Sequence, residues 1–132
     1  MPQLDVVIKI QNGLRLVAER NYMAKVTVAT TPTFTCKFKD TDFSLATDIC
    51  FNLENINVKL EKSGDSLAID GSTISVYLSQ EETLSLHEDT YAEIQFNWLY
   101  PVPNSDEYRR ACSTIKSVYI GKNLKKEVMR HA

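Results

Sequence analysis

Two adjacent carboxylates, Glu81 and Glu82, lie beside a threonine in the stretch VYLSQEETLSL, and they are the first candidate for acid–base chemistry. Catalytic carboxylate pairs oppose each other at about 5–10 Å and have divergent pKa values. Neighbours on one helical turn point in different directions instead. Ser79 followed by Glu82 also forms a capping box, in which each side chain accepts from the other residue's backbone N–H. We therefore predict a structural helical turn near residues 79–84.

The other polar residues form no catalytic or ligand-binding constellation that we recognise. His87 has no nucleophile motif around it, and His131 lies close to the chain end. The four glycines form no phosphate loop, and Asp40-Thr41-Asp42 and Asp65…Asp70 lack an EF-hand layout for calcium. The three widely spaced cysteines indicate buried reduced thiols, not a disulfide framework or a zinc site. We expect no catalytic residue, no cofactor and no metal.

Exposed aromatic and arginine side chains are the remaining candidates for recognition. Tyr91 and Tyr100 could offer a stacking surface for a sugar or a protein partner, whereas Trp98 is expected to fill the core. Arg109 and Arg110 follow a loop-like stretch, PVPNSDE, and complete the set of expected partner or glycan contacts. One exposed aromatic residue is only a weak carbohydrate signal.

The composition is that of one globular domain. The chain has 132 residues, of which 43% are hydrophobic and 24% are charged. A chain of this size can bury a hydrophobic core without disulfides or bound metal ions to stabilise it. No apolar run approaches the roughly 20 residues that span a bilayer. The start, MPQLDVVIKIQNG, does not read as a secretory signal. We expect no association with a membrane.

Charge is distributed unevenly although the net charge is only −2. Residues 40–94 hold twelve acidic groups against two lysines, and residues 109–130 hold seven basic groups against Glu127. A basic tail can bind nucleic acid, especially where aromatic residues alternate with the basic ones. Here Tyr119 is the single aromatic residue among the basic groups of residues 109–130, and the pI is about 5.7, so no nucleic-acid partner is expected. Two alternatives stay open. The acidic and basic parts pair within one fold, or they meet between copies in an assembly.

Apolar residues alternate with polar ones along most of the chain, which is the pattern of half-buried strands. YAEIQFNWLY is the longest such stretch, and KSGDS and DGS are turns. Short strands at about ten-residue spacing predict an all-β, immunoglobulin-like antiparallel sandwich. It lacks the Cys…Trp…Cys spacing of antibody domains. A bulge is expected in the last strand, residues 109–120, because Lys116 falls in the apolar phase.

The first 22 residues are predicted to be separate from the domain proper. Asn12-Gly13 lies between two apolar arms and favours a hairpin, with a short helix over residues 14–22 as the rival. We therefore divide the chain into an N-terminal arm or hairpin extension, residues 1–22, and a sandwich domain, residues 23–132. The arm either docks on a neighbouring molecule or adds an edge to the sheet.

Five short stretches, taken in order, resemble small proteins encoded in the structural modules of phages and prophages of gut Firmicutes. They are TTPTFTCKF, VYLSQEETLSL, IQFNWLY, RRACS and GKNL. The resemblance covers residues 23–128, and the N-terminal arm departs from it. More distantly, the set is similar to the N-terminal domain of phage baseplate upper proteins, an immunoglobulin-like adaptor.

The resemblance implies a virion component and not an enzyme. We expect a structural or adaptor protein of the tail, baseplate or fibre, made in the bacterial host cytoplasm. Its expected partners are other virion proteins and further copies of itself in a ring or lattice. The alternatives are a capsid-surface decoration protein and a host-glycan-binding module. The resemblance brings no family catalytic residue to transfer.

Overall fold

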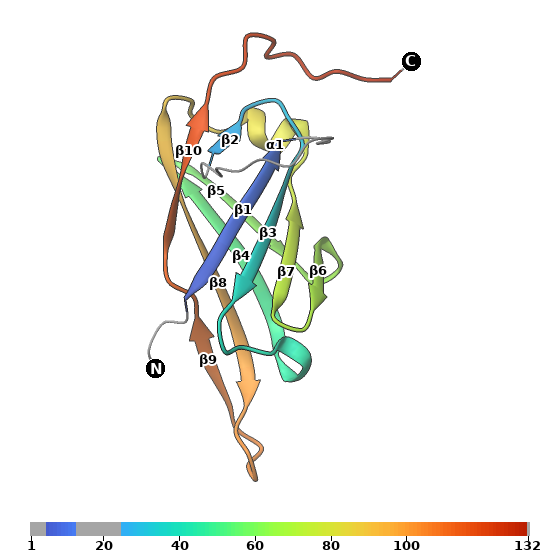
Figure 1. Ribbon diagram of the computed structural model, residues 1–132, viewed down its shortest axis with the longest axis vertical. Helices are drawn as coiled ribbons and strands as arrows, with labels where there is room; N and C mark the ends of the chain where they lie inside the picture. The colour runs from blue at the N-terminus through green and yellow to red at the C-terminus, as the bar shows by residue number, and fades with distance from the viewer. Residues whose placement is uncertain (1–4, 13–24, 132) are drawn as a thin grey trace.

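The computed structural model describes residues 5–12 and 25–131, which form two β-sheets packed face to face (Figure 1). The four-stranded sheet has the order β1-β3-β7-β6, with the bounds β1 Val6–Asn12, β3 Pro32–Phe38, β7 Thr73–Tyr77 and β6 Leu67–Asp70. The second sheet has the order β2-β10-β8-β4-β5, and β9 also pairs with β8. Its strands are β2 Lys25–Thr27, β10 Lys116–Gly121, β8 Thr90–Pro101, β4 Thr47–Asn55, β5 Val58–Ser63 and β9 Tyr108–Cys112.

The strand order confirms the predicted immunoglobulin-like sandwich. The first sheet follows the A-B-E-D order of that fold, and β10-β8-β4-β5 follows G-F-C-C′. Neighbouring strands are antiparallel in the described part of the chain, except that β2 runs parallel to β10. A single helical turn, α1 (Gln80–Leu84), carries the chain from β7 in one sheet to β8 in the other. The turn predicted near residues 79–84 thus joins the two layers.

Alternation along each strand decides which side chains fill the space between the sheets. On β8 the even-numbered residues from Ala92 to Trp98 are buried, as the sequence pattern predicts. On β4 the buried residues are Ile49, Phe51 and Leu53, and Asn55 continues this inner face. Because successive side chains point to opposite faces, one sequence phase builds the core and the other builds the outer surface.

Six aromatic rings form a connected cluster between the sheets. They are Phe34 and Phe38 on β3, Phe43 in the short 3₁₀ helix η1 (Phe43–Leu45), Phe51 on β4, and Phe96 and Trp98 on β8. Phe38 has its ring centroid 4.8 Å from that of Phe43, 5.2 Å from that of Phe96 and 5.8 Å from that of Trp98. Edge-to-face pairs at such distances stabilise beyond their buried area.

The last predicted strand is interrupted by a bulge, as expected. Between the pairs Asn97↔Cys112 and Ile94↔Lys116, β8 advances by three residues and its partner by four. The extra residue separates β9 from β10 and changes the inward phase. Buried Ser113 satisfies the backbone groups of Phe96 at the bulge. Its N–H donates to the Phe96 carbonyl at 2.9 Å, and its Oγ accepts from the Phe96 N–H at 2.9 Å.

Residues 6–12 of the predicted N-terminal arm form β1, an edge strand of the four-stranded sheet. β1 pairs with β3 from Val6↔Phe38 to Asn12↔Pro32, and Val6 and Ile10 are buried in the common core. This strand matches the added edge that was one of the two expected roles of the arm. The predicted hairpin beyond Asn12, its helical rival and the boundary between residues 22 and 23 lie outside the described residues.

We predict that Phe38→Ala lowers the free energy of unfolding by about 3–5 kcal/mol, because the substitution leaves a cavity among three rings. Urea unfolding followed by fluorescence of Trp98 measures it. Tyr77→Ala is the control, since Tyr77 is 67% exposed on the outer face and should change stability by no more than about 0.5 kcal/mol. Equal losses in the two variants would contradict the role of the aromatic cluster.

Candidate functional site

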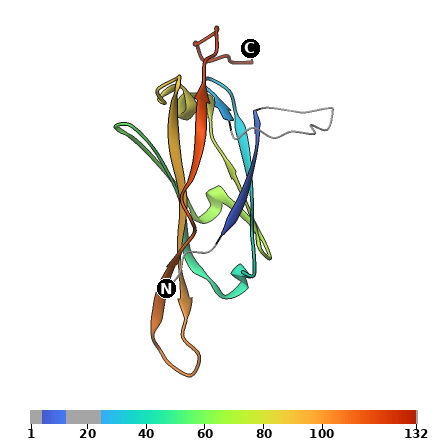
Figure 2. The same cartoon turned by 60° about the vertical axis from the view of Figure 1, so that its left-hand side comes forward.

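The hairpin formed by β8 and β9 projects beyond the end of the sandwich (Figures 1 and 2). The first half of the twelve-residue strand β8 pairs with β10, and the second half pairs with β9. The Val102 N–H donates to the Glu107 carbonyl at 2.9 Å and closes the loop at the tip. The projecting part is therefore a hydrogen-bonded pair of strands, in which β8 continues beyond the core with β9 beside it.

Three of the four predicted contact residues come together on this hairpin. Tyr100 lies directly opposite Arg109, and Leu99 lies opposite Arg110. The Arg110 Nε and Nη2 donate to Asn97 Oδ1 at 3.2 and 3.1 Å, which fixes its guanidinium on the outer face of the sheet. Tyr100 is half-buried and packs against the core, whereas Arg109 is exposed.

Sequence reasoning missed Tyr108, which pairs with Pro101 at the base of the loop and is 53% exposed. Its position immediately before the two arginines was the available signal. Tyrosine and arginine are enriched among the residues that dominate binding energy in protein interfaces. The sequence Tyr108-Arg109-Arg110 therefore puts interface-type side chains on both faces of a strand that projects from the body, with Arg109 on the face opposite to Tyr108 and Arg110.

Tyr91, the fourth predicted contact, lies at the opposite end of β8. It is 66% exposed on the outer face of its sheet, and its ring centroid is 5.4 Å from that of Tyr119 in an edge-to-face pair. The Tyr119 hydroxyl donates to Asp89 Oδ1 at 2.9 Å, and this hydrogen bond raises the pKa of Tyr119. The two predicted tyrosines thus lie on separate surfaces, and each would have to contact a sugar or a partner by itself.

The capping box at α1 is present with both of its hydrogen bonds. The Glu82 N–H donates to Ser79 Oγ at 3.1 Å, and the Ser79 N–H donates to Glu82 Oε1 at 2.9 Å. Lys62 Nζ on β5 lies 2.7 Å from Glu82 Oε2. Partial burial raises the pKa of Glu82, but the hydrogen bonds and charge of Lys62 and the Ser79 N–H outweigh it, so the pKa lies below its usual range. The pair of glutamates has a structural explanation.

The cysteines differ from their prediction in part. All three thiols are free, and Cys36 is buried, where desolvation raises its pKa to about 12. Cys50 and Cys112 are only half-buried, so the expectation that they act as core hydrophobes was wrong. Both lie on the outer face of the larger sheet, each directly opposite Asn97. The physical reason is strand phase, because each occupies the outward position of its strand.

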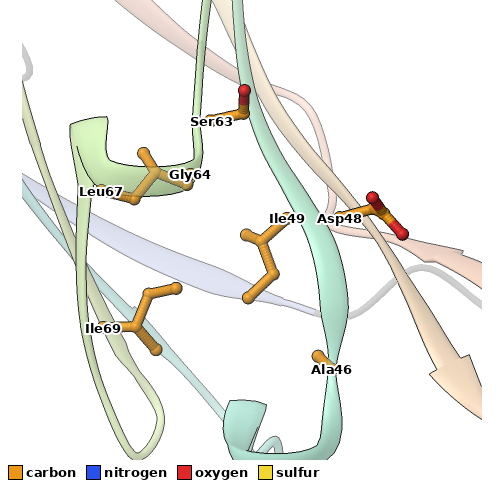
Figure 3. Close-up of a pocket in the computed structure, with 7 residues that line it drawn as sticks. All are labelled: Ala46, Asp48, Ile49, Ser63, Gly64, Leu67 and Ile69. Carbon is orange, nitrogen blue, oxygen red and sulfur yellow. The ribbon is translucent and has the colours of Figure 1, made fainter.

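A cavity of about 410 Å³ opens between β4 and β6 (Figure 3). Its lining is mainly apolar, with Asp48 and Ser63 as polar members, and the whole set is Ala46, Asp48, Ile49, Ser63, Gly64, Leu67 and Ile69. Gly64 belongs to the 3₁₀ turn η2 (Gly64–Ser66), which connects β5 to β6. This cavity could not be predicted from the sequence, because strands from both sheets border it.

Neither metal-binding nor membrane-spanning features are found in residues 5–12 and 25–131. No group of three or more histidine, cysteine or acidic side chains is placed there to hold a metal ion. Asp42, considered for calcium, instead caps η1 by accepting from the Ser44 N–H at 2.9 Å. No helix in these ranges has the length and apolar character needed to cross a membrane.

Comparisons with known proteins assign no family to the chain. No protein-family model matches it, and no curated protein matches it. A functional assignment therefore depends on the surfaces described above, of which the projecting β8–β9 hairpin is the most distinctive.

We predict that the Glu82 carboxylate makes the free energy of unfolding depend on pH in the acidic range. The pKa of Glu82 is lowered on folding, so its contribution is fully present above the ordinary value of 4.5 and is lost as the pH falls through the folded-state value. Glu82→Gln should therefore flatten the decline in unfolding free energy on acidification below that value. Urea unfolding across pH 3 to 7 (roughly the span over which carboxyl groups titrate) measures the slope.

Lys62→Met provides the matched test of the cause. It removes the ammonium that lies 2.7 Å from the carboxylate and should flatten the same part of the profile. An acid dependence that is unchanged in both variants would contradict the assignment to Glu82.

Proposed function

We propose that the chain is a non-enzymatic structural or adaptor protein of a phage virion, in the tail, baseplate or fibre region. It acts through protein–protein assembly, and its partners are other virion proteins. The observation that carries the proposal is the β8–β9 hairpin, which extends away from the sandwich and bears the exposed side chains of Tyr108 and Arg109. The five sequence stretches that resemble phage structural-module proteins support the same assignment.

The hairpin suits an adaptor because its binding groups are held before the partner arrives. The β8–β9 ladder, from Asn97↔Cys112 to Pro101↔Tyr108, fixes the backbone beneath Tyr108 and Arg109. Binding through a preorganised surface avoids the entropy cost of ordering a loop. Among the described strands β9 pairs only with β8, so its other edge can also accept a strand from a partner.

The test is incorporation into particles of the phage that encodes the chain. Tagged wild-type protein should co-purify with particles on a density gradient. The double variant Tyr108→Ala, Arg109→Ala should reduce incorporation at least about tenfold, which is the effect of losing 1.4 kcal/mol of binding free energy. Tyr77→Ala replaces a tyrosine on the other sheet that is at least as exposed as Tyr108, and it should be incorporated normally.

Particles that lack the wild-type chain would overturn the virion assignment. Equal incorporation of the double variant would overturn the role of the hairpin. Cross-linking of the same particles would identify the neighbouring protein, and a cross-link to the major capsid protein would move the chain from the tail to capsid decoration.

A glycan-binding role is the second candidate, and one observation favours it. Tyr91 and Tyr119 present an exposed aromatic pair next to the carboxylate of Asp89. Sugars bind to aromatic faces that lie beside fixed polar groups. If this surface binds host glycans, Tyr91→Ala should abolish the binding of purified protein to host cells, while Tyr108→Ala should leave it unchanged. No binding by the wild-type protein would remove this candidate.

A further inference from the structure

The strand β5 is an open edge of the larger sheet. It pairs with β4 on one side, and no described strand lies on its other side. Figure 2 shows the β4–β5 hairpin standing away from the body of the sandwich, in green at the left. An open edge strand presents unpaired N–H and C=O groups that can accept another strand. β5 is six residues long and contains neither a proline nor a bulge, either of which would block such pairing.

The two-residue turn between β4 and β5 decides which main-chain groups of β5 face the open edge. Asn55 and Val58 flank the turn and are paired, so they exchange hydrogen bonds with each other. Hydrogen-bonded and non-hydrogen-bonded positions alternate along an antiparallel pair. The N–H and C=O groups of Lys59 and Glu61 therefore point away from β4, toward the open edge.

These two edge positions carry opposite charges. The side chains of Lys59 and Glu61 are exposed on the outer face of the sheet. Glu61 forms no ion pair with another described residue. Lys59 approaches Glu54 at 3.8 Å, and these two side chains are 75% and 59% exposed, so their contact is a loose surface pair. Leu60 lies between the two charges and is half-buried against the margin of the core.

We propose that β5 of one copy pairs with β5 of a second copy, antiparallel and centred on Leu60. In this register each Lys59 lies opposite Glu61 of the other copy, and the two Leu60 side chains meet at the centre. Opposite charges that face each other across two strands stabilise their pairing. Each Lys59 then lies between Glu54 of its own chain and Glu61 of the other. The larger sheets of the two copies become one continuous sheet about a two-fold axis.

The order of charges along β5 is the reason for choosing a second copy as the occupant. The hydrogen-bonding pattern requires Lys59 and Glu61 to stay on hydrogen-bonded positions when the register changes. Moving the centre by one residue in either direction then places Glu61 opposite Glu61 or Lys59 opposite Lys59, and like charges in these positions are destabilising. In the register centred on Leu60, β5 is complementary to itself.

Ile56, in the turn of the same hairpin, also supports a contact between copies. Its side chain is 62% exposed, and its φ of 54° is unfavourable for a β-branched residue. In the proposed register Ile56 lies beside Gly64 of the second copy, just beyond the end of β5. Apart from the chain neighbours of Gly64, no atom lies within 4 Å of the position that a Cβ would occupy there, so an isoleucine has room. The contact gives this exposed side chain a partner.

Sedimentation velocity of the full chain over a concentration series tests the proposal. The wild-type protein should change from monomer to dimer as its concentration rises. Lys59→Glu and Glu61→Lys each place like charges opposite each other twice, so each should weaken association at least about tenfold. Lys37→Glu is the matched control, because Lys37 is an exposed lysine on β3 of the other sheet, and this variant should dimerise like wild type.

A mixture of the two β5 charge variants shows whether β5 is the contact surface. Between a Lys59→Glu chain and a Glu61→Lys chain, opposite charges face each other at both positions. The mixture should therefore form dimers at a concentration at which each variant alone is monomeric. Dimers in the mixture also show that both variants are folded. High salt should narrow the difference between wild type and each variant, because it screens attraction and repulsion alike.

Amide hydrogen exchange tests the backbone pairing directly. Exchange at Lys59 and Glu61 should slow as the protein concentration rises, because their N–H groups become hydrogen-bonded in the dimer. Exchange at Leu60, whose N–H already faces β4, should change less.

Ile56→Asn separates the turn from the fold. Asparagine tolerates a positive φ, so this variant should raise the urea midpoint of the monomer and still weaken dimerisation. Dimerisation as strong as that of wild type would remove Ile56 from the contact.

A wild-type chain that stays monomeric throughout refutes self-pairing and leaves the β5 edge to a strand of a different protein. Failure of the mixed charge variants to dimerise, or dimerisation that neither charge reversal weakens, refutes it as well. β4 and β8 separate β5 from β9 in the sheet, so the Tyr108→Ala, Arg109→Ala variant should dimerise normally. A chain that dimerises yet is absent from virions would keep this contact and lose the proposed function.

Discussion

The aromatic cluster between the sheets is the interaction on which the remaining structure depends. In antibody-type domains a disulfide between strands B and F packs against a tryptophan and links the sheets. Here β3 and β8 occupy those positions, and Cys36 on β3 is a free thiol. Phe38 instead contacts Phe96 and Trp98 across the sandwich, at centroid distances of 5.2 and 5.8 Å. The sheets are therefore held together by close packing of side chains and not by a disulfide between these two strands.

The projecting hairpin depends on this cluster through a single strand. Ala92, Ile94, Phe96 and Trp98 anchor β8 in the core, and the strand then continues beyond it to Pro101. The bulge at Ser113 lets the returning chain pair with β8 first as β9 and then as β10. Because Ser113 bonds the Phe96 backbone, the branching point lies against the aromatic cluster. Phe96 consequently has two roles: its ring packs against Phe38 across the sandwich, and its backbone holds the point from which the hairpin projects.

Features encoded within a few residues could be predicted from the sequence. The capping box needs only Ser79 and Glu82, and the bulge was visible because Lys116 falls in the apolar phase of its strand. The two-residue turn at Ile56 shows the opposite case. A β-branched residue with a φ of 54° is unfavourable, so local preference gave no reason to expect it. The long pairing of β4 with β5 on either side overrides that preference.

Features that depend on strand pairing could not be predicted. Tyr100 meets Arg109, and Tyr91 meets Tyr119, only through the register of β8 with its two neighbours. The cavity requires strands from both sheets, and no local pattern in the sequence encodes their separation. The positions of Cys50 and Cys112 follow from the same register, because both lie beside Asn97 on the outer face.

The uneven charge of the sequence is matched in part by ion pairs within the fold. Lys126 pairs with Glu88 and Arg130 pairs with Glu81, so part of the basic end meets the acidic middle within one fold. Lys125 also pairs with Glu127 within the C-terminal segment itself. Of the two alternatives suggested by the sequence, pairing within one fold therefore accounts for three of the basic groups at this end, because Lys125, Lys126 and Arg130 each have a carboxylate partner in their own chain.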